Sequence, residues 1–366
     1  MKILVIGNNQ KGMQVFRGLL LRRLTELGNR VTVAVPVDED TGFFDLSGIG
    51  IKNISMDRRG KDPFKEFKLI IGLSRLIKAD NYDLVITYTI KPNIYGGTIA
   101  RWLSIPYAAN ITGLGTALES DGLLKKVAVR LYKTALKKAK AVFFENASNR
   151  DFFIDNGIIR SDQAKLLNGA GVDLEQFTYH PYSGHDRFRF LFVGRVMKEK
   201  GINELLTAAE MLADNGYDCV LDIVGWMEED YSEIIKQKEA KGLVKYYGLQ
   251  SDVRPFYADA DCFVLPSWHE GMANTNLEAA ATGRPVITSD IPGCKEAVIE
   301  GKTGFLFEKA NVESLYAAMK KMMELSEDQR AGMGLEGRHH MERVFDKEKV
   351  VAETIECLKR RSPNLV

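Results

Sequence analysis

Short apolar runs alternate with longer stretches of mixed polarity along most of the chain. A run of consecutive apolar residues is typical of a buried strand, whereas apolar residues at every third or fourth position are typical of a helix. In the first half, the strands predicted in this way are Lys2–Ile6, Val31–Val35, Leu84–Tyr88, Tyr107–Ile111 and Val142–Phe144. In the second half they are Phe190–Val193, Val220–Val224, Val244–Tyr247, Cys262–Leu265, Pro285–Thr288 and Gly304–Phe307. The helices expected between them include Phe16–Leu27, Asn93–Leu103, Ile202–Asn215, Tyr231–Lys241 and Val312–Leu325.

This alternation predicts an α/β fold with two doubly wound parallel sheets. The apolar rhythm lapses over residues 168–186 and then restarts, and a chain of 366 residues exceeds a single typical core. We therefore expect two Rossmann-like domains, 1–182 and 183–345. Two such domains facing each other leave a cleft lined by the carboxyl ends of both sheets, where open α/β sheets bind their ligands.

The stretch Cys262–Gly283 carries the first candidate chemistry. An apolar strand ends at Pro266, a loop containing Glu270 follows, and a helix is expected to begin near Thr275. Unpaired backbone N–H groups at such a helix start favour anions. Two interpretations of Glu278 stay open: it faces a ligand, or it closes a capping box with Thr275.

A second cluster, Gly194–Gly201, follows the first strand of the second domain. Arg195 and Lys200 flank a turn that opens the helix at Ile202, so two cations and a helix N-terminus converge on one place. A diphosphate suits this arrangement. The alternative is a pair of ordinary surface cations.

Charge is distributed unevenly along the chain. Residues 1–182 contain 26 Lys/Arg and 18 Asp/Glu, a balance of +8, whereas the remainder contains 24 and 31, a balance of −7. Much of the positive charge lies in Lys125–Lys140, which has seven basic residues and no acidic one. This segment is either a helix with a solvated face or a patch that meets an anionic membrane or a lipid diphosphate. The basic side chains that we assign to such a surface are Lys125, Lys126, Arg130, Lys133 and Lys137.

Several classes of site are not indicated by the composition. The four cysteines are far apart, which argues against zinc or a disulfide framework and for a reducing cytoplasm. The apolar run after Met1 is too short for a signal peptide, no run is long enough to span a membrane, and no nucleic-acid-binding motif is present. Two Asp-x-Asp matches, Asp38–Asp40 and Asp259–Asp261, are interpreted as chance rather than as a metal site.

The motifs of the second half occur in a recognisable order. They are G-R-x-x-x-x-K-G at Gly194–Gly201, E-G-x-x-x-x-x-x-E-A at Glu270–Ala279, G-x-P-V-I at Gly283–Ile287, and G-x-x-E-x-V-x-x-G-x-T-G at Gly293–Gly304. Their order and spacing resemble the retaining GT-B glycosyltransferases of family 4. In the first half, Thr89–Gly97 and Thr112–Gly115 look like the subgroup that adds sugars to polyprenyl-diphosphate-linked intermediates of bacterial capsule, O-antigen and N-glycan assembly.

The resemblance implies roles for individual residues. Arg195, Lys200 and Glu270 would be catalytic: the two cations would hold the donor diphosphate and stabilise its developing charge, and Glu270 would lie beside the donor sugar. Glu278 would accept hydrogen bonds from the ribose. The remaining donor-binding residues would be Gly271, Met272, Ala273, Asn274, Thr275, Gly225 and Trp226. The acceptor-binding residues would be Gly12, Lys91, Asn93 and Gly113. Residues 346–366 would form a C-terminal helix that crosses back to the first domain.

The implied activity is transfer of a hexose or N-acetylhexosamine from a UDP-sugar, with retention, to a polyprenyl-diphosphate-linked saccharide at the inner face of the cell membrane. Neither a metal nor another cofactor is expected. One departure is that no histidine precedes His180, although many family members place one near the donor sugar. Either Thr89 or backbone groups would then make that contact, or it would come from elsewhere. The alternatives are a hydrolysing sugar-nucleotide epimerase, which needs acid/base groups such as histidines, and a non-enzymatic nucleotide-binding module.

Overall fold

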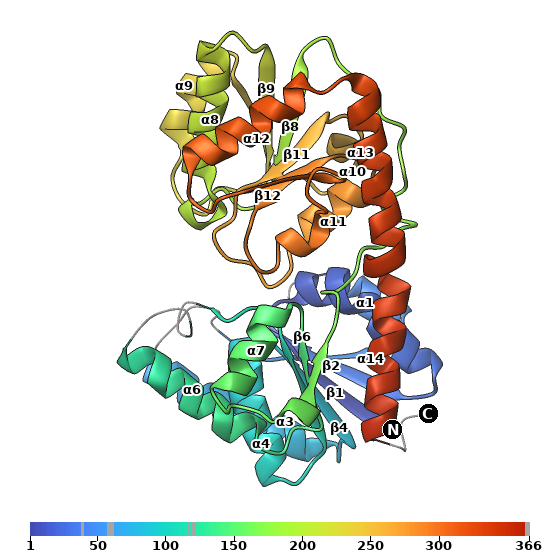
Figure 1. Ribbon diagram of the computed structural model, residues 1–366. Helices are drawn as coiled ribbons and strands as arrows, with labels where there is room; N and C mark the ends of the chain where they lie inside the picture. The colour runs from blue at the N-terminus through green and yellow to red at the C-terminus, as the bar shows by residue number, and fades with distance from the viewer. Residues whose placement is uncertain (38–39, 57–61, 116–117, 119–121, 363–366) are drawn as a thin grey trace. The chain divides into compact units, whose positions relative to one another are not determined.

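The computed structural model describes residues 1–37, 40–56, 62–115, 118 and 122–362 (Figure 1). The chain divides into two compact units: Met1–Ala170 together with Glu348–Val366, and Gly171–Lys347. Asp38 and Glu39, from the first Asp-x-Asp match, lie outside the described residues. Among the helices of the described part, none combines the length and hydropathy that crossing a bilayer requires.

The first unit is built on a seven-stranded parallel sheet in the order β3-β2-β1-β4-β5-β6-β7. Its strands are β1 (Lys2–Ile6), β2 (Arg30–Val35), β3 (Gly50–Asn53), β4 (Leu84–Tyr88), β5 (Tyr107–Ile111), β6 (Ala141–Phe144) and β7 (Ala164–Leu166). The central register pairs Ile3 with Val31 of β2 and with Leu84 of β4. The strand order reverses between β1 and β4, which is where open α/β sheets bind ligands.

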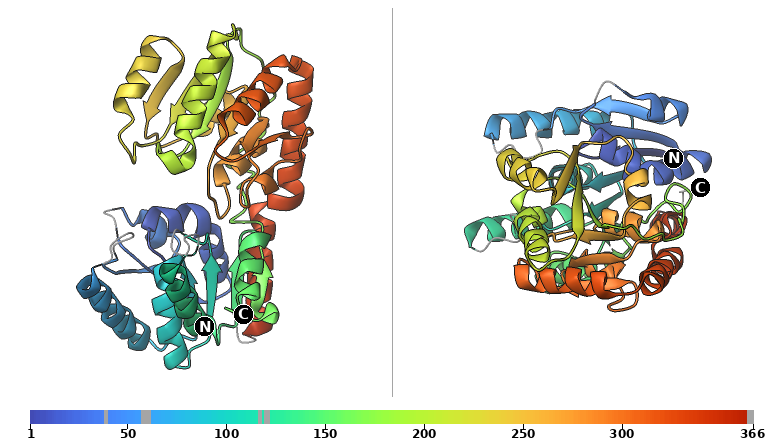
Figure 2. Two further views of the ribbon diagram at one scale, coloured as in Figure 1. Left: turned by 60° about the vertical axis from the view of Figure 1, so that its left-hand side comes forward. Right: turned by 90° about the horizontal axis from the view of Figure 1, so that it is seen from above.

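Helices cover both faces of this sheet, as Figures 1 and 2 show. They are α1 (Gln10–Glu26), α2 (Gly42–Leu46), α3 (Pro63–Ala79), α4 (Gly97–Trp102), α6 (Leu123–Leu136), α7 (Ala147–Asp155) and α14 (Lys347–Arg361), with a π-helical turn, η1 (Pro92–Gly96), before α4 and a 3₁₀ turn, η2 (Ser161–Gln163), before β7. Successive side chains of a strand point to opposite faces. Accordingly Leu4 and Ile6 pack into the core with α3, α4 and α6, whereas Ile3 and Val5 pack into the core with α1 and α14.

The second unit is built on a six-stranded parallel sheet in the order β10-β9-β8-β11-β12-β13. Its strands are β8 (Phe188–Val193), β9 (Cys219–Val224), β10 (Val244–Gly248), β11 (Cys262–Leu265), β12 (Val286–Ser289) and β13 (Gly304–Phe307). Its helices are α8 (Ile202–Asp214), α9 (Ser232–Ala240), α10 (Arg254–Ala258), α11 (Asn274–Ala281), α12 (Val312–Glu324) and α13 (Glu327–His340), with short turns η3 (Lys198–Lys200), η4 (Lys295–Ala297) and η5 (Met341–Phe345). The order reverses between β8 and β11.

The fold-class prediction of two doubly wound parallel sheets is confirmed. Most predicted strands agree with the observed ones to within two residues. The first helix begins earlier than expected, at Gln10, because the Asn9 side chain caps it by accepting a hydrogen bond from Gly12 N at 2.5 Å. Strand β3, which forms one edge of the first sheet, and helix α3 were not predicted.

Candidate active site

The loops after β8 and β11 lie side by side at the switch point of the second sheet. The two strands are neighbours, with Phe190 opposite Cys262, so their carboxyl ends share one edge. Trp268 N donates to Glu199 O at 2.9 Å, which ties one loop to the other. Gly201 has a φ of +72°, and a Cβ there would lie 2.1 Å from Pro266 O. Only glycine therefore allows this close approach.

This contact brings Lys200 and Glu270 together, although they are far apart in the sequence. Lys200 Nζ forms an ion pair with Glu270 Oε1, and both side chains are mostly buried, at 17% and 14% exposed. Ser267 Oγ donates to the same carboxylate oxygen at 2.8 Å. The arrangement holds an ammonium and a carboxylate at fixed positions above the carboxyl end of the sheet.

Arg195 lies in the same loop and is linked to Trp226 through Glu228. The distance from Arg195 Nη1 to Glu228 Oε1 is 3.7 Å, and Trp226 Nε1 donates to Glu228 Oε2 at 3.0 Å. Arg195 Nη1 is buried and has no hydrogen-bond partner among the described residues. A buried donor left unpaired is costly, so an acceptor atom from a ligand or water is favoured there.

Gly225 allows the loops after β8 and β9 to touch. Its φ is +142°, and a Cβ would lie 1.8 Å from Gly194 O. The adjacent backbone is fixed by the hydrogen bond from Val196 N to Trp226 O at 2.9 Å. Gly225 therefore sets the position of Trp226, a residue that is 45% exposed and accessible to a ligand.

Glu278 does not cap its helix. Helix α11 begins after Ala273, without a side-chain cap, so the capping-box interpretation is wrong. Instead, Tyr257 OH donates to Glu278 Oε2 at 2.9 Å. Burial raises the pKa of the Glu278 carboxyl to about 7, against the lowering effects of the Tyr257 hydrogen bond and the charge of Lys347.

The loop before α11 is held by the segment before η4. Ala273 N donates to Gly293 O at 2.7 Å, and Asn274 N donates to Met272 O at 3.0 Å. Two of the backbone N–H groups that the sequence places at an anion-binding helix start are thus engaged within the protein. Asn274 Oδ1, by contrast, is buried and has no partner among the described residues.

The predicted acceptor residues lie in the first unit. Gly12, Lys91 and Gly113 follow the neighbouring strands β1, β4 and β5, so they share one edge of the sheet. Lys91 Nζ pairs with Glu66 Oε1 at 2.5 Å, and Tyr95 OH donates to Glu66 Oε2 at 2.8 Å.

Asn93 differs from these three residues because it is only 1% exposed. It accepts from Thr87 Oγ1 at 2.7 Å and donates to Asn110 O at 2.8 Å, which fixes η1 to the sheet. Asn93 therefore supports the predicted acceptor segment from inside instead of facing solvent.

Thr89 is strained at the switch point of the first sheet. It follows β4 directly and has a φ of +71°, which a β-branched residue rarely adopts. Its hydroxyl is buried and has no hydrogen-bond partner among the described residues. Strain of this kind clusters at ligand sites, which agrees with the contact considered for Thr89 from the sequence.

Several partners in these sites were not predicted from the sequence: Glu66, Glu228, Tyr257 and Ser267. Of these, only Glu228 carried a local signal, because it stands in an acidic run directly after a strand and Gly225.

The second Asp-x-Asp match, Asp259–Asp261, takes part in hydrogen bonds within the second unit. Asp261 accepts from Tyr182 OH and from Arg189 N, both at 2.8 Å, at the amino end of β11. Within the described part of the chain, no three His, Cys, Asp or Glu side chains are grouped closely enough to hold a metal ion.

The chain was compared with known families, sequences and structures. Residues 2–146 match the model described as glycosyl transferase 4-like, and residues 180–340 match glycosyl transferases group 1. The chain is 27% identical to the N,N'-diacetylbacillosaminyl-diphospho-undecaprenol alpha-1,3-N-acetylgalactosaminyltransferase of Campylobacter jejuni, over 92% of this chain and 93% of that enzyme. It is 29% identical to the UDP-Gal:alpha-D-GlcNAc-diphosphoundecaprenol alpha-1,3-galactosyltransferase of Escherichia coli, over 71% of each.

Among solved structures, Anabaena Alr3699/HepE in complex with UDP and glucose shares the fold. Its TM-score is 0.80 at 19% identity, over 98% of this chain and 100% of the other. A glycosyltransferase from Rickettsia africae gives a TM-score of 0.79 at 18% identity, over 99% of each chain. The first match spans β1 to β6 of the first sheet and the second spans all strands of the second sheet, each with its switch-point residues. This chain therefore belongs to the GT-B glycosyltransferases, with a glycosyl transferase 4-like domain followed by a group 1 domain.

Proposed function

We propose that this enzyme transfers a hexose or N-acetylhexosamine from a UDP-sugar to a polyprenyl-diphosphate-linked saccharide, with retention and without a metal ion. The observation that carries the proposal is the cluster of Arg195, Lys200 and Glu270 at the switch point of the second sheet. The names of the Campylobacter and Escherichia coli relatives, which specify undecaprenyl-diphosphate acceptors, support the acceptor class. The UDP in the Anabaena structure supports the donor nucleotide.

In this proposal the two cations bind the donor diphosphate. Arg195 offers a buried N–H without a hydrogen-bond partner among the described residues, and Lys200 offers an ammonium whose present partner is a carboxylate. As the bond from the anomeric carbon to the phosphate oxygen breaks, negative charge grows on the leaving diphosphate, and both cations stabilise it more strongly than in the ground state. They would neutralise the charge on the leaving diphosphate, which a metal ion does in other enzymes with a phosphate leaving group.

Retention follows if the acceptor hydroxyl approaches from the face that the phosphate leaves. The new carbon–oxygen bond then forms on the same side, and the hydroxyl proton moves to the departing phosphate oxygen. No separate general base is needed, which is compatible with the absence of histidine before His180. Glu270, held by Lys200 and Ser267, would position the donor sugar.

The rest of the donor is assigned to neighbouring residues. Glu278 would accept hydrogen bonds from the ribose hydroxyls in its ionised form, and the exposed ring of Trp226 would border the base. The first unit would bind the acceptor through Gly12, Lys91 and Gly113.

Helix α6 supports action at the inner face of the membrane. It exposes apolar side chains, including Leu123 at 78%, next to Lys126 and Arg130. A basic helix with exposed apolar residues binds anionic lipid surfaces in its own plane. The enzyme would thereby meet its lipid-linked acceptor as a peripheral protein.

The test is a screen of UDP-sugars against short-chain polyprenyl-diphosphate-linked saccharides in the presence of a chelator. UDP release, product mass and the anomeric configuration by NMR are measured. We expect an α-linked product from one donor class, and loss of turnover by roughly a hundredfold or more in Arg195→Ala and Lys200→Ala. UDP binding without release from any pair, or release of an epimerised free sugar, would contradict the proposal.

A further inference from the structure

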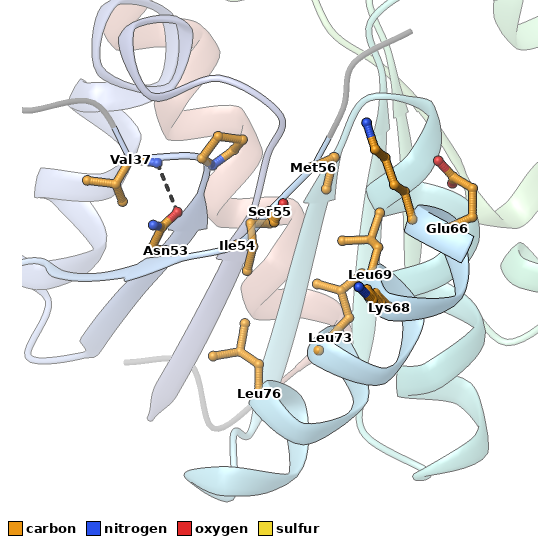
Figure 3. Close-up of a pocket in the computed structure, with 13 residues that line it drawn as sticks. Val37, Asn53, Ile54, Ser55, Met56, Glu66, Lys68, Leu69, Leu73 and Leu76 are labelled. Carbon is orange, nitrogen blue, oxygen red and sulfur yellow. Dashed lines mark hydrogen bonds between the residues drawn. The ribbon is translucent and has the colours of Figure 1, made fainter. Parts of the chain in front are cut away.

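A groove of about 900 Å³ lies in the first unit between the edge strand β3 and helix α3. In Figure 3, Leu69, Leu73 and Leu76 extend from α3 toward the segment Ile54–Met56, which continues from β3. The volume is at the upper end of the range for small-molecule sites. No residue assigned so far to the donor or the acceptor lines the groove.

The floor of the groove is apolar and preformed. Leu69 and Leu73 are buried in the core on this face of the sheet, as are Ile54 and Met56 from the strand side. Helix α3 contains Gly72 among the groove residues, and a Cβ built there would meet no atom within 4 Å. Glycine inside a helix costs roughly 1 kcal/mol relative to alanine. Here it leaves space over the apolar floor.

The groove also has a positively charged side formed by the first turns of α3. Lys65 and Lys68 line it, and neither forms an ion pair with another residue of the described ranges. The acidic residue between them, Glu66, is engaged by Lys91 and Tyr95. Two lysines near a helix N-terminus oppose the helix dipole, so an anion placed there relieves their repulsion and is attracted by both.

The groove adjoins the predicted acceptor residues through Glu66. This carboxylate lines the groove and pairs with Lys91 at 2.5 Å, directly after β4. A molecule whose sugar lies near Lys91 would therefore reach the groove with its other end. On the same turns of α3, Phe64 and Phe67 are exposed at 80% and 63%, which suits a ligand with an apolar tail.

We propose that this groove binds the lipid-diphosphate end of the acceptor, with Lys65 and Lys68 on the diphosphate and the apolar side chains of Ile54, Leu69 and Leu76 on the first isoprenyl units. This inference rests on the proposed function, because it assigns a site to the acceptor of that reaction. It commits to one occupant, an isoprenoid diphosphate, because the groove combines a cationic side with an apolar floor.

Gly72→Leu tests the groove without removing a contact. The new side chain would project into the space above the floor, and the better helix propensity of leucine favours folding. The matched control is Gly332→Leu, at another helical glycine whose Cβ would also meet nothing within 4 Å, in the second unit. A second variant, Lys65→Gln with Lys68→Gln, removes the charges.

Binding of geranylgeranyl diphosphate, inorganic pyrophosphate and geranylgeraniol to the full chain is measured by calorimetry, with UDP as the reference ligand. We expect the lipid diphosphate to bind at least about tenfold more weakly to Gly72→Leu and to the lysine variant, while Gly332→Leu and all UDP affinities stay unchanged. Pyrophosphate alone should bind more weakly than the lipid diphosphate and should respond only to the lysine variant.

Equal affinity of the lipid diphosphate for wild type and Gly72→Leu would overturn the inference, as would pyrophosphate binding as tightly as the lipid diphosphate. Kinetics separate this failure from failure of the proposed function. If wild type and Gly72→Leu turn over a lipid-linked acceptor with the same KM, the groove assignment is wrong and the proposed function stands. If the groove binds as expected but wild type transfers no sugar, the proposed reaction is wrong and the binding site stands.

Discussion

Replacing Glu278 with glutamine tests two effects of its carboxyl group: the pH dependence of stability and the affinity for the donor. Glutamine keeps the shape of the side chain and one acceptor oxygen but cannot ionise. In the folded protein the Glu278 pKa is raised from 4.5 to about 7, chiefly by burial, and the carboxyl accepts the hydrogen bond from Tyr257 OH. The variant should therefore change the pH dependence of stability and the affinity for the donor, each in a direction that can be stated beforehand.

The stability effect follows from proton linkage. Between pH 4.5 and about 7 the folded carboxyl keeps a proton that the unfolded chain has released, so the free energy of unfolding falls as the pH rises. A shift from 4.5 to about 7 corresponds to at most about 3 kcal/mol, fully lost above the folded pKa. In Glu278→Gln the side chain does not titrate, so the free energy of unfolding does not fall in this way. Its stability relative to wild type should rise across the interval and level off near pH 8.

Ionisation of Glu278, which lowers the stability of the fold, should strengthen binding of the donor. Only the ionised carboxylate accepts hydrogen bonds from both ribose hydroxyls, so the donor KM of wild type should fall as the pH rises through about 7. In Glu278→Gln the KM should be flat with pH and roughly ten- to hundredfold higher at pH 8, as expected for hydrogen bonds to a charged group. Tyr257→Phe keeps the carboxylate and removes a hydrogen bond that lowers its pKa, so its KM profile should move to higher pH.

The measurements are thermal unfolding followed by circular dichroism from pH 4.5 to 8.5, and initial rates of UDP release over donor concentration from pH 6 to 8.5. An unchanged donor KM in Glu278→Gln at pH 8, with the stability difference present, would show that the carboxyl has no ribose role. A wild-type KM without pH dependence, together with equal stability profiles, would refute the raised pKa itself.

Three further outcomes are expected. Lys200→Ala should lower kcat and also lower the melting temperature, because it leaves the mostly buried Glu270 carboxylate without its cation. Gly201→Ala should lower both stability and kcat, since a Cβ would collide with Pro266 O; Gly216→Ala, at a φ of +83° with nothing within 4 Å, should cost only roughly 1–2 kcal/mol and leave kcat unchanged. Lys126→Glu with Arg130→Glu should reduce co-sedimentation with anionic vesicles, and unchanged co-sedimentation would remove α6 from the membrane surface.

Much of the fold could be read from local pattern. Most strands of the two sheets are buried on both faces and are therefore nearly continuous apolar runs, so β1, β4, β5, β11 and β13 have the bounds that the sequence predicts. Strand β3 escaped prediction because it is short and mostly exposed at the sheet edge. Helix α3 did carry a signal, since Leu69, Leu73 and Ile77 recur every four residues and are buried.

The candidate site could be predicted only in part from local sequence patterns. Motif spacing named Arg195, Lys200, Glu270 and Glu278, because each stands in a short turn beside a strand or at the start of a helix. The capping box at Glu278 was a local possibility that the structure does not use. Its partner, Tyr257, comes from α10, and no local rule links the two residues.

The sequence by itself determined the fold class, the division into two α/β units and the glycosyltransferase family, because apolar periodicity and turn motifs are local properties. Tertiary structure alone decided that Lys200 pairs with Glu270, that burial raises the Glu278 pKa, and that Asn93 is enclosed by the sheet. It also decided that a strand and a helix without recognised motifs enclose a groove. These features depend on which strands are neighbours, and strand order is fixed by long-range packing instead of by any short stretch of sequence.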